Sequence, residues 1–243
     1  MRTLILIFIL ALSLDAKLIE ANYKVTYGLL GTIVEAKVTL NSDAENYCII
    51  LEAEAVGLAK TLSGGRKEYY ESSGRVEDGL FLTDNYTVVK KRKSKTTTSR
   101  HTIKNGEIKV KKFVEEKGDV KVSEETLDYK AKFDYLSLYG NVIYRLDNEK
   151  KDRWDIKTIG GKADDKKVTI TRLVDANLNK MKKDLKTETE HYLFINVHQK
   201  IFSSKEGMLN VAMDKDGIIQ KAVLKDVIFF GDITGTLVGK TVR

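Results

Sequence analysis

The chain has 243 residues, of which 42% are apolar, 32% charged and 8% aromatic, and its formal net charge is +7. The apolar fraction excludes a disordered chain, and seventeen glycines with one cysteine exclude the collagen-like and disulfide-rich classes. No Gly/Ser linker and no repeat with a period of about 20–50 residues divides the sequence. We therefore expect a single β-rich domain over residues 17–243.

The first sixteen residues have the pattern of a secretory signal peptide. Met1-Arg2 is a short positive start, nine apolar residues run from Leu4 to Leu12, and Ala16 offers a cleavage position. Such a run spans about 14 Å as a helix, well short of a hydrocarbon core about 30 Å thick. We expect export to the periplasm; an uncleaved anchor and a cytosolic first helix are the alternatives. No cysteine stands at the end of the run, so we do not expect a lipoprotein.

The charge is unevenly distributed along the chain. Residues 90–112 contain ten Lys or Arg and one acid, whereas residues 115–128 contain six acids and two lysines. These segments predict either a dipolar surface that meets anionic head groups, anionic polysaccharide or an acidic protein face, or a solvated hairpin whose charges protect a strand edge. Nucleic acid is not an expected partner, because the basic segment has no interleaved aromatic residues for base stacking.

Most of the chain after residue 16 alternates apolar and polar side chains with a period of two. The alternation is clear at residues 34–40, 108–111, 168–171 and 193–201. Turn residues separate the runs, at 41–43, 104–106 and 214–217. This pattern is typical of antiparallel strands with one buried face, and we expect about ten to thirteen strands joined as hairpins. A sheet of that size curls, so we predict a large curved sheet, half-barrel to barrel-like.

One segment, residues 133–146, breaks the period of two. Its polar side chains recur every three or four residues, at Asp134, Ser137, Asn141 and Arg145. This spacing predicts a helix of about three turns with a narrow polar seam and a wide apolar surface packed on the sheet. Gly140 in its middle costs the helix about 1 kcal/mol relative to alanine. The helix either fills the core or lids a cavity.

Motifs for nucleotide and metal chemistry are incomplete. Gly235 and Gly239 are separated by three residues, where a phosphate-binding loop needs four and a following helix. Asp214-Lys215-Asp216-Gly217 begins like a calcium loop, but its twelfth position is Lys225 where a glutamate is required. His191 and His198 fall on opposite faces of a strand. We expect no cofactor, no metal and no catalytic residues, although a triad assembled at long range stays open.

The order of short motifs resembles the bacterial exported proteins grouped as domain-of-unknown-function family 3108. The matching pieces begin with Tyr23-Lys24-Val25-Thr26-Tyr27-Gly28, continue through Asp134-Tyr135-Leu136-Ser137 to Tyr144-Arg145, and close with Asp216-Gly217 and Phe230-Gly231. The resemblance covers nearly all of residues 17–243, with Thr83 standing where a proline is expected. It implies a curved β-rich envelope domain and no established activity. It also singles out Asp134, Ser137 and Arg145 as a structural seam hydrogen-bonded to the sheet.

These observations favour a non-enzymatic periplasmic protein that binds an apolar or amphipathic, lipid-like ligand in the curved sheet. Acyl chains would lie on the concave face, and an anionic head group would be attracted by Lys90, Lys91, Arg92 and Lys93. The alternative is an envelope scaffold that docks a protein partner through a strand edge or its basic face. An enzyme is the third reading. No transmembrane span is expected in the chain after residue 16.

Overall fold

The computed structural model describes residues 16–160, 166–198, 207–225, 227 and 231–243. The expected signal peptide lies outside these residues except for Ala16, as does Phe230 of the last matching motif. Within them the chain forms one sheet of fifteen strands, in the order β8-β7-β6-β5-β4-β3-β2-β1-β15-β14-β13-β12-β11-β10-β9. All neighbours are antiparallel except β9 and β10, which are parallel.

The strands of the first half are β1 (Lys17–Tyr27), β2 (Thr32–Ser42), β3 (Asn46–Ala55), β4 (Lys67–Glu77), β5 (Leu80–Arg92), β6 (Lys95–Lys104), β7 (Glu107–Glu116) and β8 (Asp119–Thr126). Those of the second half are β9 (Phe133–Asp134), β10 (Arg153–Ile159), β11 (Lys167–Arg172), β12 (His191–Asn196), β13 (Met208–Met213), β14 (Ile219–Leu224) and β15 (Ile233–Val242). The helices are η1 (Gly28–Leu30), α1 (Gly57–Ser63), α2 (Tyr135–Asn148) and α3 (Asp175–Leu185).

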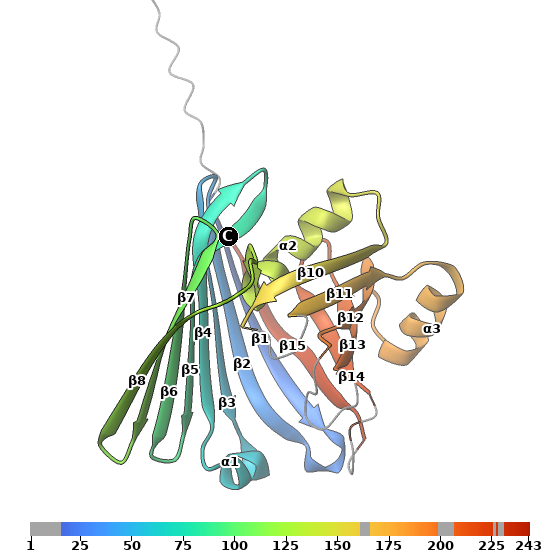
Figure 1. The fold of residues 1–243 in the computed structure, drawn as a ribbon. Coiled ribbons are helices and arrows are strands. Elements are labelled where there is room, and N and C mark those ends of the chain that lie inside the picture. Colours follow the sequence, from blue (N-terminus) through green and yellow to red (C-terminus); the bar gives the residue numbers. More distant parts are fainter. Residues whose placement is uncertain (1–15, 161–165, 199–206, 226, 228–230) are drawn as a thin grey trace, which may run out of the picture.

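The sheet curves around α2 without closing (Figure 1). β1–β8 form one wall and β10–β15 the other, and α2 contacts β3, β4 and β5 as well as β9 and β10. The far end of the second wall returns to the first, where the backbone N–H of Thr83 donates to the carbonyl of Lys132 at 3.0 Å. α1 lies at the opposite end of the first wall from α2, and α3 packs on β12, β13 and β14.

The core lies on the concave face and beneath α2. Leu136 from the helix packs in the same buried cluster as Ile19, Tyr47 and Ile49 of the first wall. Leu138, Val142 and Leu146 belong to a second cluster with residues of the second wall, among them Trp154, Ile170 and Leu193. The helix therefore buries apolar side chains against both walls, and this burial stabilises the curved sheet around it.

Without proline, tight hairpins in the first wall depend on residues with positive φ. Asn105-Gly106 joins β6 to β7 with φ values of 53° and 77°, and Asp78-Gly79 joins β4 to β5 with 51° and 77°. Positive φ at both central residues gives the turn whose twist matches antiparallel strands. These two-residue connections place β4–β7 in sequence order along the wall.

The predicted fold class, a mainly β protein with a large curved antiparallel sheet and a packed helix, is confirmed. The estimate of ten to thirteen strands was too low, since the described residues form fifteen; β8 is exposed along its whole length and β9 has only two residues, so neither has one buried and one exposed face. The predicted helix at 133–146 begins at Tyr135 and ends at Asn148, since Phe133 and Asp134 form β9. The sequence analysis also missed α1 and α3. Among the described residues, no helix is long and apolar enough to cross a membrane.

Candidate functional site

A cavity of about 260 Å³ lies between α2 and the strands β1, β2 and β5 of the first wall. Apolar side chains of β1, β2, β5 and α2 line most of it: Ile19, Ala21, Leu40, Phe81, Tyr139 and Ile143. The turn between β13 and β14 supplies Gly217 and Ile218, and the lining also includes the polar residues Lys17, Ser42, Asp147, Asn148 and Asp216. We call this space the α2 cavity. An apolar interior with a few polar groups is the usual composition of a small-molecule site.

Gly140 sets how closely α2 approaches the sheet. A Cβ atom at this position would lie 2.7 Å from a ring carbon of Phe81 and 3.1 Å from Cδ1 of Ile49. The ring of Phe81 is itself stacked on Tyr47, with centroids 4.6 Å apart. The absence of a side chain therefore lets the helix backbone pack directly on these residues at the inner end of the cavity, which explains a glycine that is unfavourable for the helix itself.

Asp134 anchors the start of α2 to the sheet. Its side chain caps the helix, because Oδ1 accepts hydrogen bonds from the backbone N–H groups of Leu136 (2.7 Å) and Ser137 (3.2 Å). Oδ2 accepts from the hydroxyls of Ser72 on β4 and Thr83 on β5. Asp134 is fully buried, and burial raises the pKa of its carboxyl, although the hydrogen bonds from Ser72 and Thr83 oppose this rise.

Asn141 attaches the middle of α2 to an otherwise open stretch of β5. β5 pairs with β6 only from Asn85 onward, so the backbone groups of Phe81 on that side need another partner. The N–H of Phe81 donates to Oδ1 of Asn141 at 2.7 Å, and Nδ2 of Asn141 donates to the carbonyl of Phe81 at 3.0 Å. The polar seam of the helix thus meets backbone and hydroxyl groups of the sheet, and its members take part in positioning the cavity.

Arg145, the last residue of the predicted seam, has different partners. Its Nη1 donates to the side chain of Glu149 at 2.5 Å, and its guanidinium lies over the ring of Phe133, 5.4 Å from the centroid. Ser137, in contrast, hydrogen-bonds to Thr83 at 2.9 Å. The structure therefore brings Asp134 and Ser137 together on the sheet and places Arg145 at the other end of the helix.

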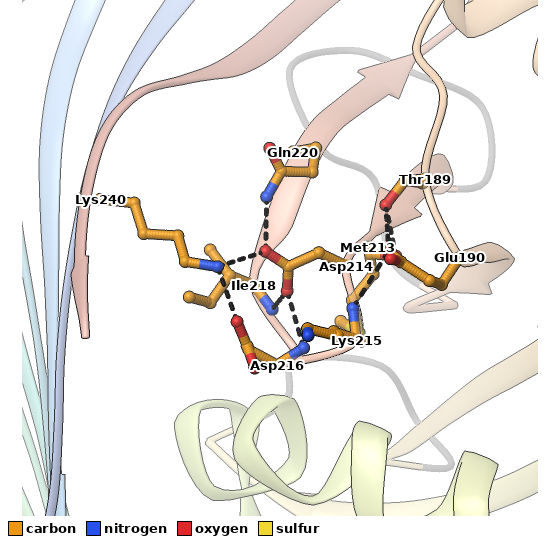
Figure 2. Close-up of polar contacts among 9 residues, drawn as sticks. All are labelled: Thr189, Glu190, Met213, Asp214, Lys215, Asp216, Ile218, Gln220 and Lys240. Carbon is orange, nitrogen blue, oxygen red and sulfur yellow. Dashed lines mark hydrogen bonds and ion pairs between the residues drawn. The ribbon is translucent and has the colours of Figure 1, made fainter. Parts of the chain in front are cut away.

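An ion-pair cluster holds the β13–β14 turn against β15 beside the cavity. Figure 2 shows Nζ of Lys240 between the carboxylates of Asp214 (2.7 Å) and Asp216 (2.8 Å). Asp214 also accepts hydrogen bonds from the backbone of Ile218 and from Gln220. The bond from Lys240 lowers the pKa of the Asp216 carboxyl. The four residues with calcium-loop character are thus a hairpin turn, in which a lysine ammonium takes the position between the carboxylates.

Lys90, Lys91, Arg92 and Lys93 do not lie at the α2 cavity. Lys90 is nine residues beyond Phe81 on β5, which is about 30 Å at about 3.3 Å per residue. Because successive strand residues face opposite sides, Lys90 and Lys91 point to opposite faces of the sheet. Lys90 lies over the ring of Tyr70, and Lys93 forms a turn whose N–H donates to Gly64 after α1.

The basic and acidic segments expected to form a dipolar surface occupy adjacent strands. Lys95 on β6 pairs with Glu116 on β7 at 3.0 Å, and Lys111 on β7 pairs with Glu124 on β8 at 2.5 Å. The three neighbouring strands β6, β7 and β8 therefore neutralise part of their own charge. This arrangement follows from the two-residue turns, which set acids and lysines in register.

No protein-family model matches this chain, and no curated protein matches it. The resemblance to domain-of-unknown-function family 3108 therefore stays a prediction.

Proposed function

We propose that this chain is an exported, non-enzymatic periplasmic protein that binds one small apolar or amphipathic molecule in the α2 cavity. The observation that carries the proposal is an apolar space beneath a helix that is fixed at its start by Asp134 and at its middle by Asn141. A cavity held open by polar anchors resists collapse when it is empty, as a binding site must.

The volume limits the ligand. A dry apolar cavity of about 150 Å³ is enough to bind benzene, so 260 Å³ accommodates roughly ten carbon atoms. This suits a short acyl chain, the end of a longer chain, or a small ring system, rather than a complete two-chain lipid. The polar groups of Lys17, Asp147 and Asp216 among the lining would meet the polar end of an amphipathic ligand.

Export is proposed from the apolar run at Leu4–Leu12 and Ala16. The non-enzymatic assignment is proposed because the buried carboxylate of Asp134 already accepts four hydrogen bonds within the fold and does not line the cavity. A carboxylate in that position serves as an anchor.

A cavity-filling substitution tests the binding proposal. Ala21 is buried on β1 and lines the cavity, so Ala21→Leu reduces its volume. Ala36→Leu is the matched control, because Ala36 is half-buried on the neighbouring strand β2 and is not part of the lining. We expect an environment-sensitive apolar fluorophore to bind the wild type and Ala36→Leu, and to lose binding in Ala21→Leu. Equal binding by both folded variants would reject the cavity as the site.

The edge of β8 supports a second candidate function, docking of an envelope protein by strand addition. Every residue of β8 is exposed, including Val120 and Val122, and β7 is the one strand that pairs with it in the described part of the chain. The N–H of Leu127 donates to Ile108, so by alternation the odd-numbered residues of β8 bond to β7 and Val122 presents its N–H outward.

Proline at position 122 therefore removes an outward donor and spares the β7–β8 ladder. A photo-crosslinker at position 120 is expected to capture an envelope partner in the parent protein and in a Val122→Thr variant, but not in Val122→Pro. Crosslinking that survives Val122→Pro would count against strand addition.

A further inference from the structure

A second hollow, of about 450 Å³, lies where the C-terminal end of α2, residues 130–133 and β10 meet. We call it the basic hollow. Six of its lining residues carry positive charge: Lys130, Lys132, Arg145, Lys151, Arg153 and Lys157. It shares no residue with the lining of the α2 cavity. The two sites can therefore be tested independently of each other.

Among the described residues, the acids in this lining are Glu149 and Asp155, and both already have several partners. Glu149 accepts hydrogen bonds from Arg145 (2.5 Å) and from Nε1 of Trp154 (2.7 Å), and it lies 3.9 Å from Lys151. Six cations against two acids leave a net charge of +4 in the lining. A concave surface of one sign concentrates counter-ions more effectively than a flat one.

Asp155 is similarly engaged. It pairs with Arg153 and Lys167, each at 3.6 Å, and accepts a hydrogen bond from the hydroxyl of Thr169 at 2.5 Å. Neither acid is therefore free to neutralise Lys132 and Lys157, which have no ion pair among the residues that the structure describes.

The parallel pairing of β9 with β10 places like charges side by side. Phe133 is in register with Thr158, so Lys132, the residue just before β9, lies beside Lys157 on β10. Like charges in such positions repel each other. A bound anion would remove that repulsion.

Arg145 adds an arginine that is already fixed in place. Its side chain is only 13% exposed, one face of its guanidinium covers Phe133, and Nη1 is held by Glu149. Its buried Nε has no hydrogen-bond partner among the described residues. An arginine with an unused N–H beside several lysines is suited to oxygen-rich anions, because the guanidinium fork matches their geometry.

The geometry points to binding of a phosphate-type oxyanion in the basic hollow, through Lys132, Lys157 and Arg145. The phosphate group belongs either to a free small molecule or to a lipid head group, and the same residues would recognise both. This site is separate from the apolar ligand proposed above.

Calorimetric titration with inorganic phosphate and pyrophosphate at low ionic strength tests this inference. The test variant is Lys132→Gln/Lys157→Gln, and the matched control is Lys109→Gln/Lys112→Gln, which removes two exposed lysines from β7. We expect the test variant to bind at least about tenfold more weakly and the control within about twofold, because only the test variant removes lysines that line the hollow and would donate charged hydrogen bonds to the anion. No binding by the wild type, or equal loss in both variants, would overturn the inference.

Vesicle sedimentation then distinguishes the two sources. Binding to phosphatidylglycerol vesicles but not to phosphatidylcholine vesicles, with competition by free pyrophosphate, would assign the head group of a lipid. Pyrophosphate binding without vesicle binding would assign a free phosphorylated molecule. If the test variant still binds the vesicles, the membrane is attracted by another surface, and a role for the hollow in lipid binding is contradicted.

Discussion

Replacing Gly140 by alanine tests how closely α2 packs on the sheet. Alanine favours the helix by about 1 kcal/mol. Its Cβ would lie 2.7 and 2.8 Å from two ring carbons of Phe81, whereas carbon atoms pack best at about 3.5–4.0 Å. The ring would have to move by about 1 Å, and its stacking on Tyr47 restricts that movement.

Overpacking of this kind costs about 1–3 kcal/mol. We expect a cost in the upper half of that range, because the added Cβ would make two contacts below 3.0 Å with the Phe81 ring, whose movement is restricted. After subtraction of the helix gain, we expect Gly140→Ala to lower the free energy of unfolding by about 1–2 kcal/mol. For a chain of this size each 1 kcal/mol corresponds to about 2–4 °C in Tm. Urea unfolding followed by the fluorescence of Trp154 measures the change directly.

Gly235→Ala is the matched control, because the nearest atom to its added Cβ is 3.9 Å away. We expect it to change stability by no more than about 0.5 kcal/mol. The double variant Gly140→Ala/Phe81→Leu should recover part of the loss, which a double-mutant cycle would report as coupling. A Gly140→Ala protein more stable than the wild type would refute the close approach, and with it the proposed shape of the cavity.

Three further predictions follow from buried or paired ionisable groups. Asp134→Ala removes a helix cap and leaves the buried hydroxyls of Ser72 and Thr83 without this acceptor, so the free energy of unfolding measured in urea should fall by about 2–4 kcal/mol. A fall of less than about 1 kcal/mol would contradict the anchoring role. Burial lowers the pKa of His101 below 6.5, so the folded state disfavours its charged form. The free energy of unfolding should therefore fall as the pH drops below 6.5. His101→Gln should flatten that dependence in unfolding curves measured from neutral to mildly acidic pH. Lys240 lowers the pKa of Asp216 below 3.8, so the stability that this pair contributes is present above pH 3.8 and is lost as the pH falls through the pKa of the folded state. Acid unfolding of Lys240→Met should show less of this loss. An unchanged acid unfolding profile would argue against the ion-pair cluster.

The period-two alternation was sufficient to predict the fold class, although not α1, α3 or the parallel pairing of β9 with β10. One buried face per strand and turn residues between runs favour antiparallel hairpins, and a sheet of this size is expected to curve. The helical spacing from Asp134 to Arg145 likewise located α2 to within two residues at either end. Its boundaries could not be read exactly, because Asp134 is at once the last residue of β9 and the cap of the helix.

The candidate sites could not be predicted, because each is assembled from distant segments. The α2 cavity needs Ala21, Phe81, Ile143 and Ile218 together, and only the curvature of the sheet brings them into one lining. The basic hollow combines residues near 131, 145 and 155, none of which forms a conspicuous charge run. The more obvious basic run at 90–112 does not border either site, and its register with the following acids pairs several of its charges.

The central claim, that the α2 cavity holds an apolar ligand, is tested most directly by native mass spectrometry of protein purified from periplasm. Wild type and Ala36→Leu should each carry one small apolar or amphipathic molecule that solvent extraction releases, and Ala21→Leu should be free of it. A clean unliganded mass for the wild type, or the same bound molecule on Ala21→Leu, would contradict the account.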